Sequence, residues 1–99
     1  MRTFERGVGL TNACGSAMGA STFAAGLTGR LPFDRSIVVR NRGGLVRAIA
    51  ATDGMVTLSG NATFEWSGTV IVENGAARDL VMSEQHADEV AAWAAAVAA

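Results

Sequence analysis

Short hydrophobic runs separated by turn-forming residues occupy the middle of the chain and predict β-strands. Between residues 36 and 82, apolar and polar side chains alternate with a period of two, which is typical of strands that bury one face. Turn signals rich in glycine, asparagine and aspartate separate these runs at residues 41–44, 53–54, 60–61, 67–68 and 74–75. The spacing predicts a compact antiparallel meander, sandwich or small barrel.

The alternation indicates where each strand lies. The expected strands are residues 36–40, 45–51, 55–59, 62–67 and 69–73, with 77–82 as a candidate sixth. The pairs Asp53-Gly54 and Asn74-Gly75 favour type I′ hairpin turns, and Gly60-Asn61 suits type II′.

Residues 1–35 are expected to form an N-terminal arm or loop region. Residues 7–30 are rich in small side chains and contain six glycines, each of which costs a helix about 1 kcal/mol relative to alanine. We therefore expect an extended segment that orders against a neighbour, with at most one short helix near residues 21–25. Pro32 marks its boundary, because proline holds the preceding residue in an extended conformation.

The last segment predicts a helix. Ser83 is a plausible N-cap, and Val90, Trp93 and Val97 have helical spacing. No charged residue follows Glu89, which suits a helix that packs in a groove. The expected fold is therefore mainly β (α+β): an arm at residues 1–35, an antiparallel β module at 36–82, and a helix at 83–99 that packs on the module or on a neighbour.

Composition narrows the function classes. The net charge of −1 lacks the excess of positive charge that is typical of proteins that bind nucleic acid or acidic membranes. All basic residues are arginine, which indicates a GC-rich genome such as that of an actinobacterium or its phage. Neither a secretion signal nor a membrane span is evident, so we expect a cytoplasmic product.

The sequence presents no clear catalytic constellation. Cys14 is the one cysteine, so an intrachain disulfide is excluded, and no Cys/His cluster could hold zinc. Cys14, His86 and Asp88 form the one conceivable set for nucleophilic catalysis, but nothing in the sequence positions them together. We interpret Cys14 as a passive thiol and expect no enzyme, no catalytic residue, no cofactor and no metal.

Residues 44–68 resemble small head-decoration and minor capsid proteins of tailed phages. The shared pattern is a Val/Ile-Ala-Ala-like strand, a glycine-containing turn and an aromatic strand bounded by glycines. The resemblance implies a virion protein that forms oligomers on a capsid or at the head–tail junction, and it carries no catalytic residues.

The leading hypothesis is accordingly a structural subunit of a homomeric assembly, located in a virion, with a major capsid or other virion protein as a further partner. Its expected interface residues are the large apolar side chains outside the β module: Phe23, Leu27, Phe33, Trp93 and Val97. The alternative is a small β-barrel or sandwich that binds a small ligand, with Met55, Phe64 and Trp66 lining a cavity. A third option is a regulatory or toxin–antitoxin-like module that binds a protein.

Overall fold

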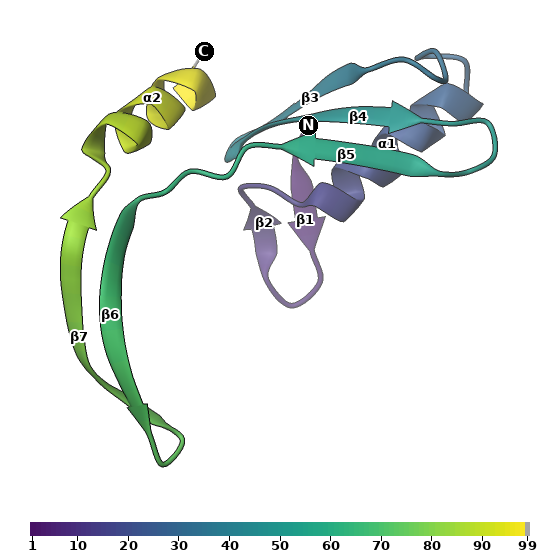
Figure 1. Ribbon diagram of the computed structural model, residues 1–99. Helices are drawn as coiled ribbons and strands as arrows, with labels where there is room; N and C mark the ends of the chain where they lie inside the picture. Colours follow the sequence, from purple (N-terminus) through teal and green to yellow (C-terminus); the bar gives the residue numbers. More distant parts are fainter. Residues whose placement is uncertain (99) are drawn as a thin grey trace. The chain divides into compact units, whose positions relative to one another are not determined.

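The computed structural model describes residues 1–98, and the chain forms two compact units, Met1–Asn61 and Ala62–Ala99 (Figure 1). The elements are β1 (Thr3–Glu5), β2 (Gly9–Thr11), α1 (Gly15–Leu27), β3 (Ile37–Asn41), β4 (Gly44–Ala50), β5 (Val56–Gly60), β6 (Trp66–Glu73), β7 (Ala76–Gln85) and α2 (Ala87–Ala98). Every strand pair is antiparallel. The predicted fold class, mainly β with small antiparallel sheets and a C-terminal helix, is confirmed.

The first unit has a three-stranded sheet covered by a helix. The strand order is β3-β4-β5, and α1 packs on the sheet, mainly against β4 (Figure 1). The core lies between these layers: Met18 of α1 is 1% exposed, and Ala48 and Ala50 of β4 are buried beneath it. Small alanines on β4 let the helix approach the sheet closely, which is why one methionine fills the centre of this core.

Helix α1 occupies the segment that the sequence analysis expects to be an extended arm. Two of its glycines, Gly15 and Gly19, lie against β5, and Gly26 lies against Phe33 in the loop that follows the helix. A Cβ at Gly19 would stand 3.3 Å from Val56 Cγ1, and a Cβ at Gly26 would stand 2.8 Å from the ring of Phe33. Packing against the sheet and against this loop thus compensates for the low helix propensity of glycine. The propensity argument failed because it counted the glycines without testing whether they share one face.

The end of α1 also follows from a glycine. Gly29 has φ +73°, and the amides of Thr28 and Arg30 donate to the carbonyls of Ala24 and Ala25. A residue in the left-handed region just after the last turn ends a helix, and glycine adopts it without steric cost.

The second unit is a two-stranded ribbon followed by α2. Strands β6 and β7 pair along their length, and Asn74 and Gly75, with φ of 50° and 75°, join them. Positive φ at both central residues is the type I′ geometry that the Asn-Gly pair predicts. Of the described residues 62–98, none is buried.

Other turns differ from expectation. Gly60-Asn61 ends the first unit instead of making a hairpin, and the expected strand at 62–67 begins at Trp66. Asp53-Gly54 is not type I′, because only Gly54 has positive φ. Strand β7 continues through Ser83 to Gln85, so α2 starts later than predicted; Ser83 Oγ instead donates to the carbonyl of Ser67. The residues that resemble a helix start in the sequence, from Ser83 on, instead extend β7 and pair with β6.

Candidate functional site

Cys14 stands at the beginning of α1. Its backbone is extended (φ −147°, ψ 108°), and its carbonyl accepts the first helical hydrogen bond from the Met18 amide at 3.0 Å. The thiol is partly buried, and within the described chain it makes no capping hydrogen bond to the first turn. The helix therefore begins with amides that the N-cap side chain does not cap, next to the sulfur of Cys14.

The first turn of α1 has no negative charge of its own. It contains no acidic side chain among the described residues, and its residues Gly15, Ser16 and Ala17 are small. The N-terminal end of a helix dipole carries a partial positive charge that favours an anion. Here this field acts on the position of the thiol, and no carboxylate of the first turn offsets it.

The residues before Cys14 are held by the turn between β3 and β4. The Gly43 amide donates to the Asn12 carbonyl at 2.7 Å, and a Cβ at Gly43 would lie 3.0 Å from the Cβ of Asn12. Asn41 Nδ2 also donates to Thr3 Oγ1 at 3.2 Å. A side chain at Gly43 would push the two segments apart, so this glycine permits the contact that fixes the approach to Cys14.

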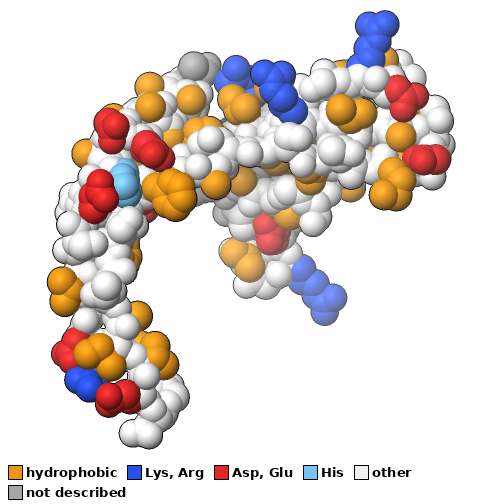
Figure 2. Space-filling model, viewed as in Figure 1, with side chains coloured by type: hydrophobic (Ala, Val, Ile, Leu, Met, Phe, Trp, Pro, Cys, Tyr) orange, Lys and Arg blue, Asp and Glu red, His pale blue; other side chains and the backbone are white. Residues whose placement is uncertain are grey.

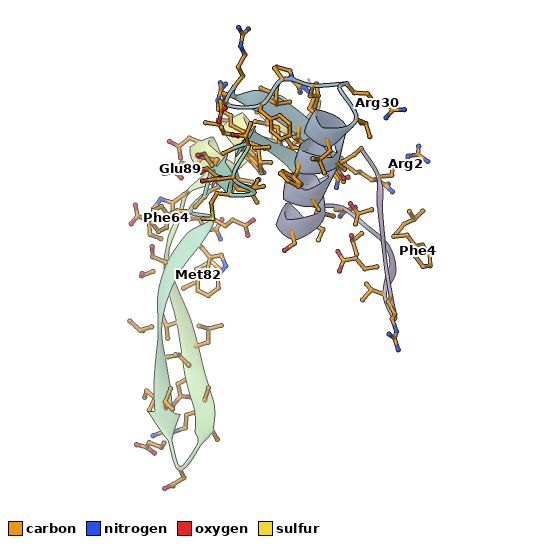
Figure 3. All side chains as sticks on the ribbon, turned by 90° about the vertical axis from the view of Figure 1, so that its right-hand side faces the viewer. Arg2, Phe4, Arg30, Phe64, Met82 and Glu89 are labelled. Carbon is orange, nitrogen blue, oxygen red and sulfur yellow. The ribbon has the colours of Figure 1, made fainter. Side chains whose placement is uncertain are left out.

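The hairpin β1–β2 is also tied internally. Thr11 Oγ1 donates to Glu5 Oε1 at 2.8 Å, and both side chains are partly buried. On the other face, Phe4 pairs with Leu10, and both are largely exposed (76% and 70%); Figure 3 shows Phe4 pointing away from the hairpin.

A pocket of about 450 Å³ adjoins this hairpin on the first unit. It is lined by Met1, Arg2, Leu10, Thr11, Asn12, Asn41 and Arg42. The pocket thus lies beside the same Asn12 segment that leads to Cys14.

The residues expected at an interface fall into both units. In the first unit Phe23 and Phe33 contact each other edge to face, with ring centroids 5.9 Å apart, whereas Leu27 is 66% exposed. In the second unit Trp93 and Val97 of α2 are partly buried. Their role in an interface stays a prediction.

Cys14, His86 and Asp88 are not brought together within one unit. Cys14 belongs to the first unit, whereas His86 and Asp88 belong to the second. His86 instead helps to begin α2: its amide donates to the Glu65 carbonyl, its carbonyl accepts from the Val90 amide, and its Nε2 lies 3.2 Å from Ser67 Oγ. Its contacts are those of a residue that fixes the start of a helix.

The described residues contain neither a metal-ligand cluster nor a membrane-spanning helix. In residues 1–98, no group of three or more His, Cys, Asp or Glu side chains is placed to hold a metal ion. The described helices, α1 and α2, are both too short to span a membrane.

The chain is similar to curated bacterial proteins named diaminopimelate epimerase. It is 43% identical over 84 residues to the protein of Listeria innocua, which covers 81% of this chain and 26% of that protein. The protein of Clostridium acetobutylicum is 36% identical over 88 residues, covering 85% of this chain and 26% of its own length. The chain therefore spans about a quarter of the length of these relatives. No protein-family profile and no solved structure matches it.

These similarities correct several expectations. The predicted resemblance to phage capsid proteins is wrong, and so are the virion role, the virion location and the prediction that the chain has no enzymatic function, because the relatives are named as an enzyme. The pattern in residues 44–68 misled because alternating small, β-branched and aromatic residues occur in antiparallel strands of many functions. The alternative of a ligand cavity gains no support either: Met55 lies in the first unit, Phe64 and Trp66 lie in the second, and all three are exposed.

Cys14 is the functional candidate that the sequence analysis set aside. Its position at a helix start could have been predicted from the spacing of Gly15, Gly19, Thr22 and Gly26, which places four small residues on one face of a helix that starts just after the cysteine.

Proposed function

We propose that this chain supplies the Cys14-bearing part of an epimerase that acts on diaminopimelate or a closely related amino acid. The observation that carries the proposal is the place of the thiol at the start of a helix whose other residues are anchored in a core. The similarity to diaminopimelate epimerases over most of the chain supplies the reaction class.

Epimerisation inverts one carbon centre. At the α-carbon of an amino acid this requires removal of a proton from one face and delivery of a proton to the opposite face. A thiolate can accept the first proton and a thiol can donate the second. We assign one of these two roles to Cys14, with its Sγ exchanging a proton with the α-carbon.

The helix start supports this role because it offers a place for an anionic group of a substrate. First-turn amides that the Cys14 side chain does not cap can donate to such a group, and the partial positive charge of the helix end favours it, since helix N-termini bind carboxylates in this way. An α-carboxylate held there would bring the α-carbon close to the sulfur.

The packing of α1 on the sheet holds Cys14 in a fixed position. Met18, Gly19 and Thr22 anchor α1 on the sheet, and the Gly43–Asn12 hydrogen bond fixes the residues that precede the cysteine. A proton-transfer group needs such support, because a small displacement from the reacting carbon reduces the rate steeply.

A chimera tests the proposal. The segment of the Listeria innocua enzyme that matches this chain is replaced by the chain, and epimerisation is followed as exchange of the α-hydrogen of diaminopimelate for deuterium from D₂O. We expect measurable exchange, reduced by about 10²–10⁴-fold in Cys14→Ala, the usual contribution of one general acid or base. Ser16→Ala, an exposed change in the same turn, is the matched control and should stay within a few-fold of the unmodified chimera. A folded, active chimera that is indifferent to Cys14→Ala would refute the assignment.

A further inference from the structure

Most of the positive charge of this chain lies in the first unit. Seven of the eight arginines, but three of the nine acidic residues, belong to Met1–Asn61. Figure 2 shows several arginine side chains projecting from the surface of this unit. An excess of four positive side chains on one small unit attracts anions, and a concave site within the unit concentrates that attraction.

The 450 Å³ pocket beside the β1–β2 hairpin is such a site. Its volume lies in the lower part of the range of small-molecule sites, about 300–1,000 Å³. Two arginines, Arg2 and Arg42, line it from segments far apart in the sequence, and none of the described residues that line it is acidic. A guanidinium group presents its N–H donors in a planar fork that matches the oxygens of a carboxylate or a phosphate.

These two guanidinium groups are available to a ligand. Within residues 1–98 neither of them makes an ion pair, and the arginine that does is Arg78 of the second unit. Both side chains are exposed, and Figure 3 shows Arg2 extending into the open from the start of β1. An incoming anion would therefore gain charge-assisted hydrogen bonds without first breaking an internal ion pair.

Uncharged groups complete the lining of the pocket. The Asn12 side chain makes no hydrogen bond within the described part of the chain, so its amide nitrogen can donate to an anion. Leu10 is 70% exposed and adds an apolar wall that can contact carbon atoms. The lining thus suits a molecule that has both an anionic group and a carbon skeleton.

Hydrogen bonds hold the frame of the pocket. Asn41 Nδ2 donates to Thr3 Oγ1 at 3.2 Å, and Asn41 Oδ1 accepts from the Arg42 amide at 2.8 Å. The Gly43 amide donates to the Asn12 carbonyl at 2.7 Å. These bonds join the turn between β3 and β4 to both strands of the hairpin region. The backbone around the pocket is therefore ordered before a ligand arrives, which lowers the entropic cost of binding.

We propose that this pocket binds a small organic anion. Its phosphate or carboxylate head accepts hydrogen bonds from Arg2 and Arg42, and its short carbon skeleton contacts Leu10. The pocket is distinct from the thiol site, because neither Cys14 nor any residue of 15–17 lines it. The inference is independent of the proposed function.

Isothermal titration calorimetry on the full chain at low salt tests the proposal with inorganic phosphate, glycerol 3-phosphate and succinate. We expect one of the two organic anions to bind with a dissociation constant below about 1 mM, which two charge-assisted contacts can provide, and to bind more weakly as salt is added. Tighter binding of glycerol 3-phosphate identifies a phosphate head, and tighter binding of succinate a carboxylate head. If neither bound, or if inorganic phosphate bound as tightly as both, the proposal would be overturned.

Arginine variants test whether the pocket itself holds the anion. Arg2→Gln and Arg42→Gln each remove one guanidinium group and should weaken binding at least about tenfold. The matched controls Arg30→Gln and Arg47→Gln remove the same charge from exposed arginines of the same unit that do not line this pocket. They should leave the dissociation constant within about threefold. Equal weakening by all four variants would show that the net charge of the unit alone attracts the anion, and the proposal would be wrong.

Nuclear magnetic resonance locates the bound anion and shows whether each variant is folded. On titration of the unmodified chain, the amide shifts of residues 10–12 and 41–43 should move, whereas those of residues 15–17 should stay. Movement confined to residues 15–17 would place the anion at the start of α1. That result would overturn the pocket proposal while leaving the proposed function intact.

Discussion

The two units of this protein differ in where their apolar side chains lie. In the first unit, α1 covers the β3-β4-β5 sheet and encloses Met18, Ala48 and Ala50. In the second unit the strands are longer and as well paired, yet none of the described residues is buried. Hydrogen-bonded pairing alone thus does not make a core; a second layer is needed to remove apolar surface from water. We expect the stability of the chain to reside mainly in the first unit.

The largest effect should come from Met18→Ala. Met18 is the largest fully buried side chain, and truncating a buried methionine costs about 2–5 kcal/mol through lost burial and the cavity left behind. We expect the melting temperature of the first unit to fall by more than 10 °C, because each kcal/mol of lost stability lowers it by roughly 4–8 °C in a unit of this size. Met55→Ala, at a methionine that is 69% exposed, is the control and should shift the melting temperature little. Similar shifts for both would contradict the assigned core.

A smaller loss should follow from Gly19→Leu. The new side chain would start 3.3 Å from Val56 Cγ1 and force α1 away from β5, at a cost of about 1–3 kcal/mol for overpacking. Ala20→Leu adds bulk at an adjacent exposed position and should be nearly neutral. Urea denaturation followed by circular dichroism measures both free energies of unfolding. If the two variants unfolded alike, the glycine side of α1 would not be its packing surface.

Gly75→Val should affect the second unit alone. Gly75 has φ +75°, a conformation that costs a residue with a Cβ about 1–2 kcal/mol, and more for a β-branched one. We expect faster amide hydrogen exchange in β6 and β7, with exchange in β4 unchanged. Ala76→Val, one residue later in extended backbone, is the control. Faster exchange in both units would show that they unfold together and do not differ in stability.

The smallest effect should come from Glu89→Ala. Glu89 Oε2 accepts from the Phe64 amide at 3.1 Å; both side chains are labelled in Figure 3. The contact is exposed, so its loss should cost under about 1 kcal/mol. Asp88→Ala removes a charge from the same helix turn without that contact, and it should cost less still. Nuclear magnetic resonance chemical shifts at Phe64 provide the readout: they should move in Glu89→Ala and stay in Asp88→Ala.

Local rules were sufficient for much of the β structure. Alternation located β3, β4 and β5 to within a residue or so, because the spacing of apolar side chains within a strand is fixed by the backbone itself. The Asn74-Gly75 turn followed from the steric freedom of its two residues. Helix α1 did not follow, because residue-by-residue propensity counts glycine as a cost, whereas the sheet beneath it makes glycine necessary.

The arrangement of the candidate site likewise could not be predicted from local sequence patterns. The sequence determined that there is one thiol, a run of small residues after it, and a turn of Asn41-Arg42-Gly43-Gly44 farther along the chain. Only the tertiary structure decided that the small residues form a packed helix, that Cys14 begins it, and that Gly43 holds Asn12 in place. Strand periodicity is a property of neighbouring residues. A thiol at the start of an anchored helix depends on contacts between segments some thirty residues apart, which no local pattern contains.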